Sequence, residues 1–184
     1  MLLTKRSTHR LTAGLTLAVV ALVAVPLAGQ MSPRGTAELT LQGKKIAVEY
    51  GRPYRKGRKI MGGLVPYGEV WRTGASEATA FVTEADLEIG GTTVPKGAYT
   101  LYTLPSESTW KLIINKRPQK PGMAFDYDPS QDLVRLDLEK DMLSEPIEQF
   151  TISLERTGPD AGVLKLAWEN ALLAIPFKLK REGP

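Results

Sequence analysis

Alternation of apolar and polar residues dominates the chain after residue 36, and this two-residue period constrains the fold more than any other feature. The first run is Ala37, Leu39 and Leu41. A period of two places one face of an extended strand toward a core. Turns recur about every eight to twelve residues, which is typical of an all-β sandwich or barrel. Later runs are Ile46, Val48 and Tyr50, then Ala78, Ala80 and Val82, then stretches within residues 87–94, 99–104, 110–115, 134–138, 150–154, 164–168 and 173–177.

These runs predict an all-β fold class, with a single antiparallel β-sandwich (jelly-roll-like) domain over residues 31–184. Only residues 141–149 have a pattern for which we expect a short helical turn. Trp110 and Trp168 lie within strand runs, so we expect both in the core. The chain contains no cysteine, so packing alone must hold this domain together.

Residues 1–30 have the composition of a secretory signal peptide or an N-terminal membrane anchor. A head that carries Lys5, Arg6 and Arg10 precedes an uncharged apolar run over residues 11–27. This order is the pattern of an export signal, although the run is also at the lower limit of a membrane span. We therefore expect an exported protein, periplasmic or extracellular. It would contact a membrane only through residues 11–27, if they are not cleaved.

Most of the net positive charge belongs to this leader. The chain has 24 basic and 20 acidic residues, and three of the basic ones precede Gln30. The rest of the chain is therefore nearly neutral, whereas a nucleic-acid-binding domain needs a basic face. We expect no nucleic-acid partner, and the sequence leaves the oligomeric state open.

The amino-acid composition excludes several chemistries from the part of the chain after the leader. His9 is the only histidine, and there is no cysteine. Histidine-based acid–base catalysis, Ser-His-Asp triads and thiol nucleophiles are therefore absent. The usual ligands of zinc, copper and non-haem iron are absent for the same reason. We expect no cofactor and no metal site, and we favour a protein that is not an enzyme.

Carboxylates are the remaining groups with catalytic or metal-binding chemistry. Residues 126–132 place oxygen donors at alternate positions, as a calcium-binding loop does. The alternative is a polar turn, because Gln131 stands where such a loop needs glycine and Pro129 interrupts it. A carboxylate-dependent hydrolase would use a pair of acids such as Glu69 and Glu77.

The stretch from Tyr50 to Thr79, called the 50–79 segment below, concentrates charge and aromatic rings without a helix or strand period. It holds six basic residues, three tyrosines and a tryptophan. Segments of this kind usually lie at working surfaces. Arginine forks suit carboxylate, phosphate or sulfate, and aromatic faces suit a sugar or a cation. The alternative is that the arginines pair internally with acids such as Glu69 or Glu77, while Trp71 packs in the core.

Several motifs carry a resemblance to a known family. They are Tyr50-Gly51-Arg52-Pro53, Lys56-Gly57-Arg58-Lys59, Trp71-Arg72-Thr73-Gly74, the run Trp110 to Asn115, and Asp132-x-x-Arg135. Over about residues 31–178 the chain closely resembles the bacterial family catalogued as domain of unknown function 2911. The resemblance implies an exported all-β protein and supplies no reaction, substrate or catalytic residue. One departure is Pro121-Gly122-Met123, which stands where a Trp-Gly pair is expected.

We therefore predict an exported β-sandwich protein that binds an anionic or sugar-like envelope ligand, or a protein partner, through the 50–79 segment. The alternatives are a carboxylate-dependent hydrolase or isomerase and a purely structural envelope module. No catalytic residue is assigned. The candidate ligand-binding residues are Arg52, Lys56, Arg58, Trp71, Arg72, Glu77, Asn115, Asp132 and Arg135.

Overall fold

A computed structural model describes residues 32–118 and 125–181. The predictions for residues 1–30 and for Pro121-Gly122-Met123 lie outside these residues. Nine strands and one 3-10 turn follow the chain in this order: β1 (Arg34–Leu41), β2 (Lys44–Gly51), β3 (Thr79–Thr83), β4 (Leu87–Ile89), β5 (Thr92–Val94), β6 (Gly97–Leu104), β7 (Trp110–Asn115), the 3-10 turn Pro129–Gln131, β8 (Asp132–Arg156) and β9 (Ala161–Leu179).

Every strand pairing is antiparallel, and the strands form one open sheet in the order β1-β2-β3-β6-β7-β8-β9-β4-β5. The predicted all-β antiparallel class is therefore confirmed. Among residues 32–118 and 125–181 there is no α-helix, and thus no helix that is long and apolar enough to cross a membrane.

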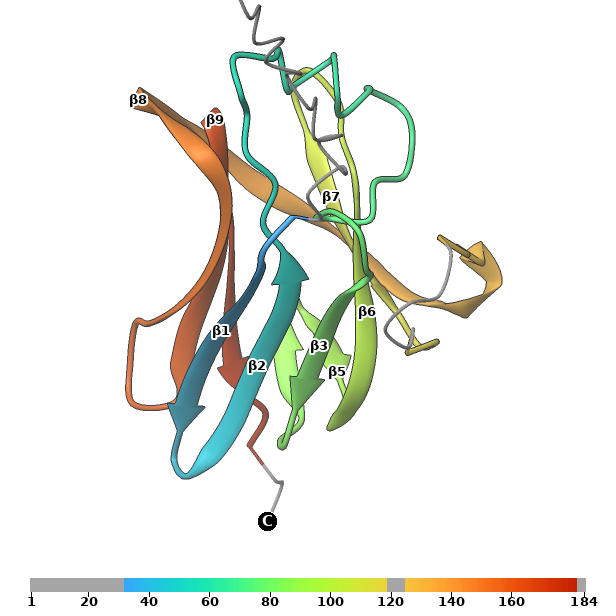
Figure 1. Cartoon of the computed structure of the whole chain (residues 1–184). Helices are drawn as coiled ribbons and strands as arrows, with labels where there is room; N and C mark the ends of the chain where they lie inside the picture. The colour runs from blue at the N-terminus through green and yellow to red at the C-terminus, as the bar shows by residue number, and fades with distance from the viewer. Residues whose placement is uncertain (1–31, 119–124, 182–184) are drawn as a thin grey trace, which may run out of the picture. The chain divides into compact units, whose positions relative to one another are not determined.

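The long strand β8 belongs to both halves of the sheet. Its residues 132–138 pair with β7, and residues from 139 onward pair with β9 (Figure 1). The Tyr50 hydroxyl of β2 accepts a hydrogen bond from the Ile152 amide at 2.7 Å, so the far part of β8 also packs on the first strands. The sheet therefore folds over in the manner of a sandwich, with apolar side chains between its halves.

The core follows the alternation in the sequence. Trp110 and Trp168 are both 1% exposed, as predicted. In β3, however, the buried residues include Phe81, whereas Val82 is 44% exposed. The strand is confirmed, but the alternating set Ala78, Ala80 and Val82 is not its buried face, because the larger Phe81 ring buries more apolar surface. Other fully buried residues are Leu41, Ile46, Val48, Leu87, Val94, Leu112, Ile113 and Ile114.

The helical turn expected over residues 141–149 is wrong, because this stretch is extended and lies within β8. Pro146 lacks the N–H group that a helix needs, and β9 offers a ladder on this side. The pairing with β9 shifts register between Met142 and Ile147, and again between Ile147 and Thr151. We call residues 143–150 the β8 bulge. Some of its backbone groups are thereby free to pair elsewhere.

Candidate functional site

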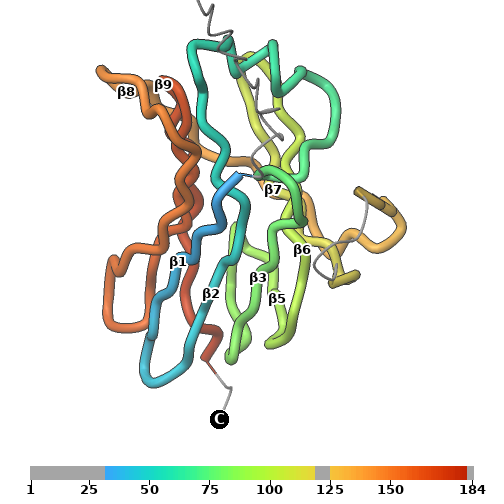
Figure 2. Tube along the Cα trace, viewed as in Figure 1, coloured from blue at the N-terminus to red at the C-terminus, as the bar shows by residue number. Residues whose placement is uncertain are grey.

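The 50–79 segment is the long connection between β2 and β3, and Figure 2 traces it from one strand to the other. Its first part pairs with the β8 bulge. The Arg55 amide donates to the Glu148 carbonyl at 2.8 Å, and the Phe150 amide donates to the Pro53 carbonyl at 2.9 Å. The β8 bulge therefore fixes residues 53–55 by backbone hydrogen bonds, which do not depend on side-chain identity.

The far part of the segment extends the sheet along β6. Trp71 and Thr103 exchange two backbone hydrogen bonds, of 2.8 and 2.9 Å. The Gly68 amide donates to the Pro105 carbonyl at 2.9 Å. The pairing of β3 with β6 covers only residues 97–101 of β6, so these bonds continue the pairing of β6 beyond the end of β3.

The middle of the segment is held by buried apolar side chains. Ile60 and Val65 are both fully buried, and the Val65 amide donates to the Ile60 carbonyl at 2.9 Å. Glu169 of β9 accepts a hydrogen bond from the Met61 amide at 3.2 Å. Much of the segment therefore packs against the rest of the fold.

Two of its arginines are occupied by this framework. Arg52 donates from Nη2 to the Thr151 hydroxyl at 3.2 Å and from Nε to the Phe150 carbonyl at 3.4 Å. Arg55 forms an ion pair with Glu169, with 3.5 Å between Nε and Oε1. Both side chains tie the segment to β8 and β9, so a ligand would have to displace these bonds to reach them.

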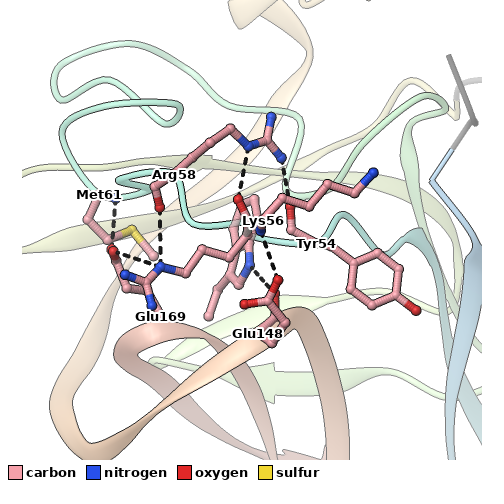
Figure 3. A network of polar contacts seen from close by, with 8 residues as sticks. Tyr54, Lys56, Arg58, Met61, Glu148 and Glu169 are labelled. Atoms are coloured by element: carbon pink, nitrogen blue, oxygen red, sulfur yellow. Dashed lines mark hydrogen bonds and ion pairs between the residues drawn. The ribbon is translucent and has the colours of Figure 1, made fainter. Parts of the chain in front are cut away.

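Among the described residues, the Arg58 side chain donates only to carbonyl groups of its own segment. Its Nε donates to the Arg55 carbonyl at 3.0 Å, and its Nη2 donates to the Tyr54 carbonyl at 2.6 Å (Figure 3). Glu148, the nearby acid, instead accepts the Lys56 amide at 2.8 Å, while the Lys56 side chain extends away from it. The positive charge of Arg58 therefore meets no carboxylate within ion-pairing distance among the described residues.

Arg72 is held in a similar way. Its Nη1 donates to the Ser76 carbonyl at 2.8 Å, and its guanidinium carbon lies 5.2 Å from the centre of the Phe125 ring. Stacking on a ring stabilises a guanidinium without neutralising its charge. No acid in the described part of the chain pairs with Arg72.

Arg58 and Arg72 line the same open hollow, which has a volume of about 310 Å³. Trp71 and Trp168 also line it, and their rings stack with centroids 5.9 Å apart and an angle of 18°. Trp71 therefore both packs against the core and lines the hollow, and its contact with a ligand stays a prediction. The complete lining is Ser32, Pro53, Arg58, Leu64, Trp71, Arg72, Gly74, Ala75, Ser76 and Trp168.

The turn over residues 73–76 forms part of this lining in an unusual backbone conformation. Thr73 and Ser76 have φ angles of 55° and 65°, a region that non-glycine residues seldom adopt. The Thr73 carbonyl accepts a 2.7 Å hydrogen bond from the Thr79 hydroxyl, which helps to fix the turn. Strained turns of this kind concentrate at functional sites.

Three of the other candidate residues gather in a separate network. Asp132 accepts hydrogen bonds from Asn115 Nδ2 at 2.9 Å, from the Tyr127 hydroxyl at 2.7 Å and from Arg135 Nε at 2.8 Å. None of them lines the hollow. The structure therefore brings Asn115, Asp132 and Arg135 together, but apart from Arg58 and Arg72. Both carboxylate oxygens of Asp132 accept hydrogen bonds from the protein, which suits a structural role.

A group of aromatic rings lies between these two places. Phe125 contacts both Arg72 and Tyr102, and the Tyr102 and Tyr127 ring centroids are 4.9 Å apart. Burial raises the pKa of Tyr102 to about 12. Burial and the hydrogen bond to Asp132 raise the pKa of Tyr127 to about 12. Both phenols are therefore neutral near pH 7, and neither serves as a base there.

Three other acids considered in the sequence analysis are bonded away from the hollow. Glu77 forms an ion pair with Arg34 at 3.3 Å, and Asp126 forms one with Arg117 at 2.8 Å. Asp128 accepts the Ser130 amide at 2.9 Å and caps the 3-10 turn. Within residues 32–118 and 125–181 no cluster of three or more metal-binding side chains occurs.

Sequence reasoning did not single out several lining residues. Leu64, Ala75 and Ser76 belong to no charged or aromatic pattern, and their placement depends on how the turn packs. Gly51 of β2 is the one sequence feature that relates to the position of this turn. A Cβ atom on Gly51 would lie 1.9 Å from the Ala75 carbonyl oxygen. The glycine at position 51 is what allows the 73–76 turn to approach β2 this closely.

The described residues thus define a class: an antiparallel all-β protein with an arginine- and tryptophan-lined hollow beside its longest loop. Residues 32–177 match the family described as "Protein of unknown function (DUF2911)". Because this match covers most of the chain, the protein belongs to that family, and the resemblance drawn from the motifs is confirmed. No curated protein and no solved structure matches the chain.

We expect Gly51→Ala to lower the free energy of unfolding by about 1–3 kcal/mol, because the added methyl group overlaps the Ala75 carbonyl. Gly158→Ala is the matched control, since its Cβ would lie at an ordinary 3.4 Å from Ala161. Urea unfolding of both variants measures the difference. Equal stability of the two variants would contradict the close packing of the turn on β2.

We expect the free energy of unfolding to fall as pH rises from about 10 to 12. Tyr102 and Tyr127 have folded pKa values of about 12, whereas unfolded tyrosines ionise near pH 10. Their stabilisation is therefore complete below pH 10 and is lost as pH rises through 12. Urea unfolding across this range should give a shallower decline for Tyr127→Phe than for the wild type. Identical declines would contradict the burial of this phenol.

Proposed function

We propose that the protein binds a small anionic or sugar-like ligand in the hollow between Arg58 and Arg72. The observation that carries the proposal is the pair of guanidinium groups beside Trp71, neither of which forms an ion pair within the described residues. An uncompensated charge beside an aromatic face attracts an external anion or the polar face of a sugar. The volume of about 310 Å³ is at the lower end of the range for small-molecule sites.

The composition of the hollow supports binding rather than catalysis. Its described lining contains no Asp, Glu, His, Cys, Lys or Tyr side chain that could act as a general base or a strong nucleophile. The acids of the carboxylate-hydrolase alternative, Glu69 and Glu77, do not line it. The function proposed is therefore recognition without turnover.

We place this binding outside the cytoplasm. The basic head and apolar run of residues 1–30 support export, either with cleavage or with retention as an anchor. In that location the accessible anionic and sugar-like molecules are those of the cell envelope and its surroundings.

Retention on isolated envelope polysaccharide at physiological salt tests the proposal. We expect the wild type to be retained and the double variant Arg58→Ala/Arg72→Ala to lose at least roughly tenfold in affinity, because two charge-assisted contacts are removed. Arg181→Ala is the matched control, since this arginine is 91% exposed and lies outside the hollow. Wild-type retention by the double variant, or no retention of any variant, would overturn the proposal.

A further inference from the structure

We infer that the ligand of the hollow carries an oxyanion (a carboxylate, phosphate or sulfate group) on an apolar or aromatic body. Arg72 binds this oxyanion through two parallel hydrogen bonds. This inference rests on the proposed function and narrows it. The inferred ligand is an anion and not a neutral sugar. Arg72 supplies the bidentate contact, whereas Arg58 supplies positive charge alone.

The hydrogen bonds of Arg72 leave one complete edge of its guanidinium available. Within residues 32–118 and 125–181 only Nη1 donates a hydrogen bond, to the Ser76 carbonyl at 2.8 Å. Among the described residues nothing accepts a hydrogen bond from its Nε or Nη2. These two atoms form the fork that matches a carboxylate or phosphate with two parallel bonds.

Arg72 is also held in place before any ligand arrives. The bond to Ser76 fixes one end of the guanidinium, and the Phe125 ring lies 5.2 Å from its central carbon. A side chain that is already ordered loses less conformational entropy when it binds. Arg72 therefore has an available Nε/Nη2 edge and a side chain that is already ordered.

Arg58 differs from Arg72 in this respect. Its Nε and Nη2 already donate to the carbonyls of Arg55 and Tyr54, at 3.0 and 2.6 Å. The same edge is therefore occupied, and Nη1 alone has no partner in the described part of the chain. Arg58 contributes positive charge to the hollow, a contribution that a lysine can largely replace.

Backbone amides of the 73–76 turn add to the preference for an anion. Gly74, Ala75 and Ser76 line the hollow, and within residues 32–118 and 125–181 their N–H groups have no hydrogen-bond acceptor. Successive amides in a turn that contains positive φ angles form concave sites for anions. Such amides give no advantage to a neutral ligand of the same size.

The apolar lining specifies the rest of the ligand. Leu64 is 47% exposed although it lines the hollow, and the Trp71 ring lies in the same lining. A bare inorganic anion would leave these groups in water, whereas an attached ring or aliphatic body would cover them. The hollow therefore fits an organic oxyanion better than an inorganic one.

Four probes test separately the need for an oxyanion and the need for an apolar body. They are phenyl phosphate, benzoate, the neutral phenyl glucoside and inorganic phosphate. Binding is followed by tryptophan fluorescence and by the Nε–H signals of the arginines in a ¹H–¹⁵N spectrum. We expect phenyl phosphate or benzoate to bind at least roughly tenfold more tightly than the phenyl glucoside, and to shift the Arg72 Nε–H signal. Whichever of the two binds more tightly identifies the oxyanion as phosphate-like or carboxylate-like.

Matched lysine variants test the roles of the arginines. Arg72→Lys keeps the charge but removes the fork, so we expect it to weaken the better organic anion roughly tenfold or more. We expect Arg58→Lys to weaken it by less than about threefold, and Arg181→Lys to leave it unchanged. Unfolding curves of the three variants separate a loss of binding from a loss of folding.

Tighter or equal binding of the phenyl glucoside would overturn the oxyanion inference and leave the proposed function intact. Equal effects of Arg58→Lys and Arg72→Lys would overturn the anchoring role of Arg72. Inorganic phosphate that binds as tightly as phenyl phosphate would overturn the role of the apolar lining. No response to any of the four probes would overturn the inference, whereas the proposed function is overturned only by the retention experiment on envelope polysaccharide.

Discussion

The backbone pairing between residues 53–55 and the β8 bulge is the interaction on which the site depends. Apart from Ile147, the residues of the bulge have no partner in the β8–β9 register, and the backbone groups of Glu148 and Phe150 instead bond to Arg55 and Pro53. This contact, together with the Trp71–Thr103 pairing at the far end, turns a glycine-rich connection into an ordered surface. Without both anchors, Arg58 and Arg72 would have no fixed separation.

The position of each arginine along the 50–79 segment determines whether it meets an acid of β8 or β9. Arg55 near the bulge is paired with Glu169, whereas the partners of Arg58 and Arg72 in the described part of the chain are carbonyl groups and one ring. Carbonyl dipoles hold a guanidinium in position while they leave most of its charge available to an anion. A nearly neutral domain thus presents a local positive site, which a composition-level charge count conceals.

The two-residue period predicted most strands because one face of each is buried, and the buried side chains recur at the predicted spacing. It did not identify the buried face of β3, where the Phe81 side chain is buried and Val82 is exposed. It also did not predict that β8 continues as a strand through Pro146. Arg58, Trp71 and Arg72 could be selected from composition and motif. The amides of Gly74, Ala75 and Ser76, which have no acceptor among residues 32–118 and 125–181, could not be selected, because their arrangement depends on backbone conformation and not on side-chain type.

A crystal structure of the protein with phenyl phosphate tests the central claim most directly. The account predicts the phosphate within about 3 Å of Arg72 Nε and Nη2, and the phenyl ring against Trp71 and Leu64. It also predicts that Arg58 keeps its bonds to the Tyr54 and Arg55 carbonyls. An empty hollow at saturating ligand, or Arg72 turned into an ion pair with a carboxylate of the protein, would contradict the account.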